Sequence, residues 1–176
     1  TVAQSSPLHT LRKLLFMAAT TMQSISLTTK QIIIDYPGIN FVIGDVFRWS
    51  SESQTITHPA IDNIEQLYQL LHEVGHAQLD HKDYSSGAEL LRMERDAWSY
   101  VTSVLATNYQ IPDSELRQSA DDALDSYQNW LHQRSLCPSC GAVGIEKSKN
   151  NFHCLVCSQS WKANDARSCQ LKRYKK

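Results

Sequence analysis

The chain contains 176 residues, of which 41% are hydrophobic and 20% are charged. This balance is typical of a globular protein and excludes a disordered chain, while only 6 glycines and 5 prolines exclude collagen-like and low-complexity classes. The longest apolar runs fall far short of the roughly 20 residues that span a bilayer. We therefore expect a cytoplasmic protein with no membrane partner.

The formal net charge of −1 conceals an uneven distribution along the chain. Residues 1–133 contain 8 Lys and Arg against 16 Asp and Glu, whereas residues 134–176 contain 9 against 2, so the two parts carry −8 and +7. All five cysteines lie in the second part. The sequence therefore predicts two domains, an acidic body over residues 1–135 and a basic cysteine module over residues 136–176.

The first third of the body alternates between helical and strand-like patterns. Apolar residues at helical spacing predict a helix over residues 10–23, while residues 27–36 fit either a strand or a buried helical turn. Segments rich in β-branched and aromatic residues follow, and they predict a small antiparallel sheet. These strand-like segments cover residues 39–43, 46–49 and 54–57.

The rest of the body is predicted to be helical. Apolar positions recur at 3.6-residue spacing in three long segments, which cover residues 61–79, 88–107 and 113–133. Pro112 ends the second helix, and Asp113 or Ser114 is expected to cap the third. The fold class is therefore α+β, a mostly helical body with a small sheet and a C-terminal module.

His72, Glu73 and His76 form an H-E-x-x-H pattern within the helix predicted over residues 61–79. Residues four apart lie on one helix face, so the two imidazoles can hold one ion, and neutral imidazole is a good zinc ligand. Glu73 is then placed to act as a general base toward water at the metal. The pattern predicts a catalytic zinc site that hydrolyses an amide bond.

A catalytic zinc site needs a third protein ligand as well as one open coordination position. His81 would lie off the ligand face, because it follows His76 by about 500° of helical rotation. Glu94 on the next predicted helix is favoured, with Glu89 as the alternative. The full set of downstream candidates is His81, Asp83, Glu89, Glu94 and Asp96.

The stretch from His72 to His81, followed by Glu94-Arg95-Asp96-Ala97-Trp98, resembles the ImmA/IrrE family of zinc metallopeptidases. That family has an H-E-x-G-H pattern and a downstream E-x-x-A on the next helix, and the resemblance covers approximately residues 10–110. It implies a gluzincin-like body with His72, His76 and Glu94 as zinc ligands and Glu73 as the base. It also implies a role in transcription regulation, with a DNA-binding helix-turn-helix repressor as the substrate.

Cys137 and Cys140, and then Cys154 and Cys157, form two C-x-x-C pairs separated by residues 141–153. Two such turns close a tetrahedral four-thiolate zinc site with no open position, so the predicted zinc ribbon has a structural role. Gly141 suits the positive-φ turn that follows the first pair. The fifth cysteine, at position 169, is expected to be a free thiol.

The basic residues around the ribbon are interleaved with Phe152, Trp161 and Tyr174. Basic and aromatic residues together can bind nucleic acid. The alternative is a rigid cap on the third helix with a solvated basic tail. Both interpretations stay open, as does the oligomeric state.

The leading hypothesis is a zinc endopeptidase with one catalytic and one structural zinc, acting on a protein substrate. Tyr84, Tyr100 or His81 would help to stabilise the oxyanion. An H-E-x-x-H helix with a C-terminal zinc ribbon also resembles the SprT-like class, which acts on DNA-bound proteins and uses a third histidine. The remaining alternative is a non-catalytic zinc-ribbon module that binds nucleic acid or protein.

Overall fold

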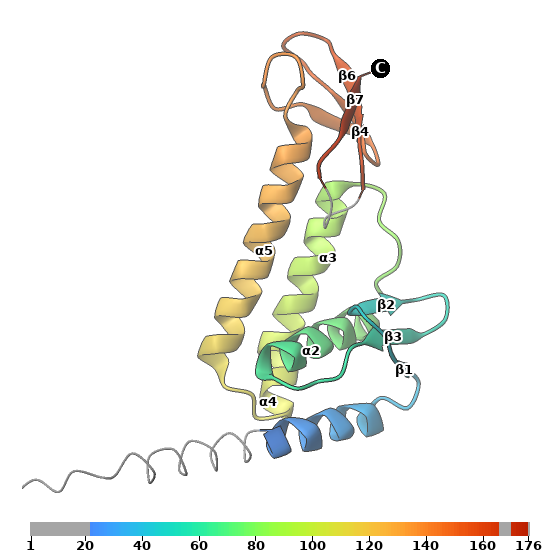
Figure 1. The fold of residues 1–176 in the computed structure, drawn as a ribbon, viewed down its shortest axis with the longest axis vertical. Coiled ribbons are helices and arrows are strands. Elements are labelled where there is room, and N and C mark those ends of the chain that lie inside the picture. Colours follow the sequence, from blue (N-terminus) through green and yellow to red (C-terminus); the bar gives the residue numbers. More distant parts are fainter. Residues whose placement is uncertain (1–21, 166–169, 176) are drawn as a thin grey trace, which may run out of the picture. The chain divides into compact units, whose positions relative to one another are not determined.

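The computed structural model describes residues 22–165 and 170–175, which adopt an α+β fold with two small sheets (Figure 1). The chain divides into two compact units, one ending at Gln78 and the other beginning at Leu79. The helix predicted over residues 10–23 lies almost wholly outside the described residues, and Cys169 lies outside them too. The predicted boundary between residues 135 and 136 stays a prediction.

Residues 22–35 of the first unit are helical, which decides between the two interpretations of this segment. Ile32 is fully buried, whereas Ile33 is 38% exposed and Ile34 is 68% exposed. A helix on a protein surface buries only every third or fourth side chain, and the three consecutive isoleucines follow that pattern. Three consecutive isoleucines fit a helix and a strand equally well, so the sequence does not show which of the three is buried.

Strands β1 (Asn40–Ile43), β2 (Arg48–Ser50) and β3 (Thr55–His58) form a sheet in the order β1-β3-β2. β2 pairs antiparallel with β3, but β1 pairs parallel with β3. The prediction of a wholly antiparallel sheet is therefore wrong, and this sheet is mixed. The reason is that β1 does not pair with its neighbour in sequence, because the chain passes around the end of β3 and places β1 and β2 on opposite sides.

Helix α2 (Ile64–Gln78) confirms the helix predicted over residues 61–79 and contains the H-E-x-x-H residues in its C-terminal half. Asn63 precedes it, and its side-chain oxygen accepts the backbone N–H of Gln66 at 2.9 Å, which satisfies one of the unpaired donors of the first turn. The helix contacts β2 and β3. Its buried apolar residues recur at helical spacing and are Leu67, Tyr68, Leu70, Leu71 and Val74.

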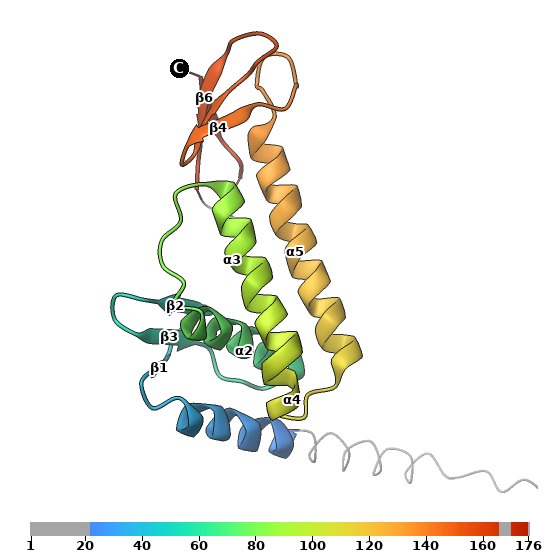
Figure 2. The same ribbon diagram turned by 180° about the vertical axis from the view of Figure 1, so that it is seen from behind.

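The second unit begins with helix α3 (Gly87–Tyr100), which continues through a π-helical turn, η1 (Val101–Leu105), into α4 (Ala106–Asn108). Ser86 caps α3 by accepting a backbone N–H of the first turn. Helix α5 (Asp113–Ser135) follows and contacts α3. The two helices lie side by side in both views (Figure 1, Figure 2). Both helices predicted for this part of the chain are confirmed.

Strands β4 (Ile145–Ser148), β5 (Asn151–His153), β6 (Ser160–Ala163) and β7 (Arg173–Lys175) form an antiparallel sheet in sequence order. The pairs β4–β5, β5–β6 and β6–β7 are all antiparallel. A small hydrophobic cluster lies against this sheet. Its buried members are Cys137, Phe152, Cys154, Trp161 and Ala163.

We call the sheet β4–β7 and the two cysteine turns at residues 137–140 and 154–157 the ribbon. Hydrogen bonds, as well as the chain itself, attach the ribbon to the C-terminal end of α5. The indole N–H of Trp161 donates to the carbonyl of Arg134 at 3.1 Å. The guanidinium of Arg173 donates to the carbonyl of Leu136 at 2.8 Å. These bonds use carbonyls at a helix end, where intrahelical partners are missing. The ribbon is therefore anchored to α5.

Candidate metal centres

His72 and His76 lie one turn apart on α2 and are 5% and 9% exposed. Their Nε2 atoms are 3.0 Å apart, and their ring planes are nearly perpendicular at 87°. Two imidazole nitrogens bound to one tetrahedral zinc ion would be about 3.3 Å apart, from Zn–N distances near 2.0 Å. The two nitrogens are therefore already spaced as ligands of a single ion.

Glu94 is the third member of this group of possible ligands. Its side chain is 5% exposed, and one of its carboxylate oxygens lies within 4.8 Å of the ligand atoms of His72 and His76. Buried glutamates are rare unless they are paired or bind a cation. A donor set of two imidazoles and one carboxylate is compatible with zinc.

Glu89, the alternative third ligand, is engaged elsewhere. Its Oε2 atom accepts the backbone N–H of Ser85 at 2.7 Å and the hydroxyl of Ser85 at 2.6 Å. These two hydrogen bonds lower the pKa of Glu89. They place the residue in the capping arrangement at the start of α3, where a carboxylate is favoured by the helix dipole. The structure therefore groups Glu94, and not Glu89, with the two histidines.

Glu73, the predicted general base, is held by the sheet. Its Oε2 atom accepts the backbone N–H of Trp49 at 2.7 Å. β2 is an edge strand, which leaves alternate N–H groups without a strand partner, and the N–H of Trp49 donates to this side chain. This bond restrains the carboxylate of Glu73, a residue that directly follows His72 in the sequence. The sequence analysis named Glu73 but not Trp49, because every residue except proline has a backbone N–H and the residue type does not show which one is used.

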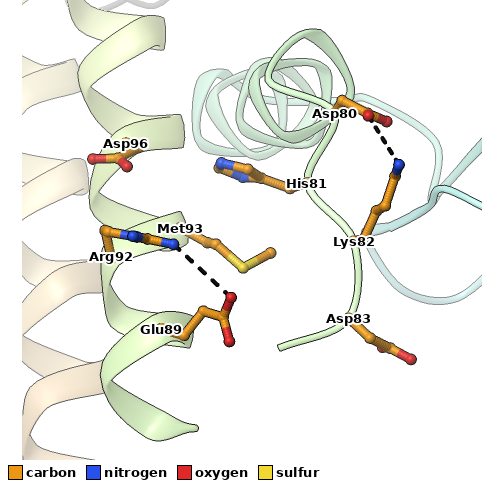
Figure 3. A pocket seen from close by; sticks show the side chains of 8 residues that line it. All are labelled: Asp80, His81, Lys82, Asp83, Glu89, Arg92, Met93 and Asp96. Atoms are coloured by element: carbon orange, nitrogen blue, oxygen red, sulfur yellow. Dashed lines mark ion pairs between the residues drawn. The ribbon is translucent and has the colours of Figure 1, made fainter. Parts of the chain in front are cut away.

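The three residues considered as oxyanion donors have different surroundings. His81 lines a pocket of about 310 Å³ together with Asp80, Lys82 and Asp83, while Glu89, Arg92, Met93 and Asp96 line its α3 side (Figure 3). Asp80 and Lys82 form an ion pair of 3.1 Å at its rim. Tyr100 is half-buried at the C-terminal end of α3.

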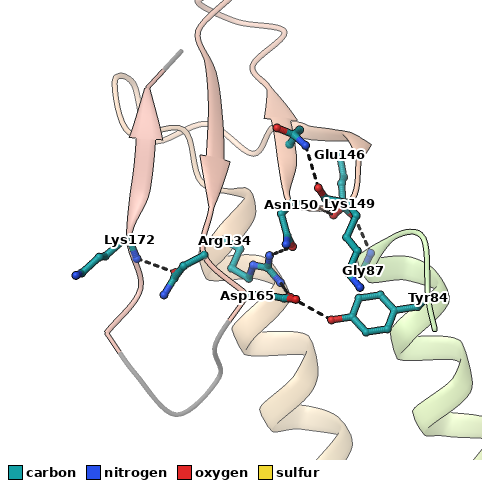
Figure 4. Close-up of polar contacts among 10 residues, drawn as sticks. Tyr84, Gly87, Arg134, Glu146, Lys149, Asn150, Asp165 and Lys172 are labelled. Carbon is teal, nitrogen blue, oxygen red and sulfur yellow. Dashed lines mark hydrogen bonds and ion pairs between the residues drawn. The ribbon is translucent and has the colours of Figure 1, made fainter. Parts of the chain in front are cut away.

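The hydroxyl of Tyr84 donates to Asp165 at 3.1 Å, and the Lys149 ammonium lies 3.9 Å from the centre of its ring (Figure 4). Burial, followed by the charge of Asp165, raises the pKa of Tyr84 to about 12. The phenol therefore stays protonated and donates to the ribbon. This use of its hydroxyl argues against Tyr84 as the oxyanion donor.

The four ribbon cysteines bring their sulfur atoms within 4.8 Å of one another. The Sγ atoms of Cys137 and Cys157 are 3.6 Å apart, and those of Cys140 and Cys154 are 3.5 Å apart. A tetrahedral zinc ion with Zn–S distances near 2.3 Å requires about 3.8 Å between sulfur atoms. The thiols are therefore spaced for one ion.

The two cysteine turns share one hydrogen-bonding pattern. In the first, the N–H of Cys137 donates to Ala142 and the N–H of Gly141 donates to Cys137. In the second, the N–H of Cys154 donates to Gln159 and the N–H of Ser158 donates to Cys154. Gly141 has the predicted positive φ of 74°, and Ser158 has the equivalent φ of 61° without being glycine. The turns are local repeats of one structure.

The thiols respond differently to this environment. Burial opposes ionisation of Cys137, but hydrogen bonds from the N–H groups of Ser139 and Cys140 lower its pKa to about 6. A hydrogen bond from the backbone N–H of Ala142 favours ionisation of Cys140, yet hydrogen bonds with the sulfur atoms of Cys157 and Cys154 raise its pKa to about 12. Four thiolates this close repel one another, so a divalent cation is needed to hold all four ionised.

Comparisons with protein-family models, with curated proteins and with solved structures found no match to this chain. Among the residues that the structure describes, no helix is both long enough and apolar enough to cross a membrane. The two groups of possible metal ligands, one of histidine and glutamate and one of cysteine, are the features that bear on function.

Proposed function

We propose that this protein is a zinc-dependent endopeptidase, with His72, His76 and Glu94 as the ligands of the catalytic ion. The observation that carries the proposal is the pair of buried imidazole nitrogens 3.0 Å apart on α2, directly beside a glutamate held by a backbone N–H. A scaffold protein has no structural need for this combination. The ImmA/IrrE resemblance supplies the substrate class, a DNA-binding helix-turn-helix repressor.

In the proposed mechanism the histidine and glutamate side chains leave one coordination position for the reaction. Zinc, when bound, supplies Lewis acidity toward water and toward a peptide carbonyl. Glu73 takes the proton of the attacking water and then delivers a proton to the leaving amine. The hydrogen bond from Trp49 restricts the rotamers of Glu73, so the base is oriented before substrate arrives.

The nature of the third ligand favours this proposal over a SprT-like protease. That class requires a third histidine, whereas the group of possible ligands with His72 and His76 contains Glu94. The four cysteines would hold the second, structural zinc, because a closed thiolate site has no position for substrate. The ribbon therefore contributes stability or binding in this proposal, and the chemistry belongs to α2.

The test is to replace Glu73 by Gln, which keeps the size of the side chain and its hydrogen bond from Trp49 but removes the base. The protein is incubated with a library of proteome-derived peptides whose amino groups are blocked, and new amino termini are identified by mass spectrometry. We expect the wild type to produce cleavages that fall by at least about 10³-fold in Glu73→Gln, while the zinc content is unchanged.

Glu65→Gln is the matched control, because Glu65 lies in the first turn of the same helix and outside both ligand groups. We expect this variant to cleave like the wild type. Cleavage retained by Glu73→Gln would overturn the mechanism. A zinc-loaded wild type that cleaves neither the library nor purified helix-turn-helix repressors would overturn the proposed activity.

A further inference from the structure

The four-stranded sheet of the ribbon has two faces of different character. Residues paired directly across antiparallel strands project from the same face. Phe152 pairs with Trp161, and both are buried at 6% and 0% exposure, so their face is covered by the hydrophobic cluster and the end of α5. Glu146 pairs with Phe152 and belongs to this covered face.

The other face of the sheet is open, and we call it the outer face. Lys162 pairs with Asn151 on one side and with Tyr174 on the other, so these three side chains form a row across the sheet. Tyr174 is 56% exposed, and Lys162 is exposed beside it. The paired residues of the outer face are Ile145, Ser148, Asn151, His153, Ser160, Lys162 and Tyr174. The exposed Lys147 lies in a β-bulge of β4 between Glu146 and Ser148, and it lines one pocket with Asn151, His153 and Ser160 of this face.

The charge of the outer face is entirely positive. Glu146 is the sole acidic residue within the described strands β4 to β7, and it lies on the covered face. Its carboxylate accepts backbone N–H groups of Gly87 and Asn150, so it does not neutralise the lysines. The outer face therefore presents Lys147 and Lys162 to solvent without a compensating carboxylate on the same strands.

A pocket of about 330 Å³ opens beside Lys147 on this sheet, and Phe152 and Trp161 also line it. Asn151, His153 and Ser160 supply polar groups to it, and the ring nitrogen Nδ1 of His153 lies 3.0 Å from the hydroxyl of Ser160. These groups can donate and accept hydrogen bonds. A cationic rim with neutral polar groups inside suits the phosphate, sugar and base edges of a nucleotide.

We infer that the outer face binds single-stranded nucleic acid. Lys147 and Lys162 pair with backbone phosphates, and Tyr174 stacks on an unpaired base. Four strands about 4.8 Å apart span about 14 Å, which accommodates a few nucleotides. An acidic peptide would satisfy the lysines, but only a nucleic acid carries a planar ring with every phosphate, so the exposed Tyr174 beside Lys162 favours nucleic acid. This inference does not depend on the peptidase activity.

The test uses the full zinc-loaded chain and a fluorescein-labelled oligothymidine of about 15 nucleotides, with anisotropy measured over a series of salt concentrations. Each phosphate contact on a single strand contributes about 0.7 to the slope of log affinity against log salt. Lys147→Ala combined with Lys162→Ala should therefore reduce the slope by about 1.4 and weaken binding about 25-fold near 0.1 M salt. Tyr174→Leu should weaken binding about tenfold with the slope unchanged, because stacking releases no ions.

Lys30→Ala combined with Lys82→Ala is the control, since it removes the same charge from exposed positions that are not part of the ribbon sheet. We expect it to change affinity by less than about threefold. Zinc content and circular dichroism confirm that each variant is folded. The inference is overturned if the wild type fails to bind, or if both double variants lose affinity equally. It is also overturned if polyglutamate competes as well as the oligonucleotide, which would identify an acidic peptide as the partner.

Discussion

Gly44 lies where the chain turns from β1 around the end of β3. Its N–H donates to the carbonyl of His58 at 2.9 Å, so the backbone continues the ladder with β3 for one more residue. A Cβ atom at this position would lie 2.4 Å from Cγ2 of Thr57. Threonine is β-branched and has few χ1 rotamers, so the methyl group of Thr57 cannot move away without strain. The close approach therefore requires glycine.

We expect Gly44→Ala to lower the free energy of unfolding by about 1–3 kcal/mol, the usual cost of adding a methyl group to a packed site. Gly38→Ala is the matched control, because a Cβ atom there would meet no described atom within 4 Å. It should change stability by less than about 0.5 kcal/mol. Urea unfolding followed by circular dichroism measures both variants. Equal effects of the two substitutions would show that the contact with Thr57 is unimportant.

At the scale of elements, Glu146 joins the ribbon to the N-terminus of α3. Its Oε2 atom accepts the N–H of Gly87 at 2.6 Å, and its Oε1 atom accepts the N–H of Asn150 at 2.8 Å (Figure 4). Gly87 is the first residue of α3, where backbone N–H groups lack intrahelical partners and the helix dipole favours an anion. One carboxylate therefore connects a strand, a turn and a helix.

Glu146→Gln should lower the free energy of unfolding by about 1–3 kcal/mol. The amide has one oxygen acceptor instead of two, and its NH₂ group would face a backbone donor, so one of the two bonds is lost together with the negative charge. Thermal and urea unfolding measure the change. Glu52→Gln, at an exposed position in the turn between β2 and β3, is the control and should be neutral. A neutral Glu146→Gln would mean that the contacts of the ribbon with α5 and with Tyr84 are sufficient to hold it.

At the scale of the whole molecule, the two ligand groups predict two zinc ions per chain. Elemental mass spectrometry should find two in the wild type, one in His76→Ala and one in Cys154→Ser, because each substitution removes a ligand from one group only. His132→Ala, at an exposed position on α5, should keep both ions. One zinc in the wild type and in His76→Ala alike would leave only the ribbon as a metal site and would favour a binding module.

The possible metal ligands can be proposed from the sequence because the chemistry of a side chain and its short spacing are local properties. An i,i+4 spacing places His72 and His76 on one helix face wherever the helix lies, and a C-x-x-C turn gathers two thiols by itself. The helices were predictable for the same reason, since an apolar period of 3.6 residues is a local property. Residue types in short windows therefore determined α2, α3, α5 and the ribbon.

The tertiary structure alone decided the relations between distant segments. The parallel pairing of β1 with β3 depends on the route of the chain around the end of β3. The alternation of apolar and polar side chains along a strand is the same in a parallel and an antiparallel pair, so it does not predict strand direction. Glu89 and Glu94 are equivalent in residue type, and only their positions separate the capping glutamate from the one grouped with the histidines.

The N–H of Trp49 that holds Glu73 is a backbone group, present at every residue except proline, so no sequence pattern marks it. The sequence by itself thus determined which side chains can bind metal, because ligand chemistry belongs to residue type and short spacing. The tertiary structure decided which of those side chains meet and what orients them, because such contacts depend on the long-range course of the backbone.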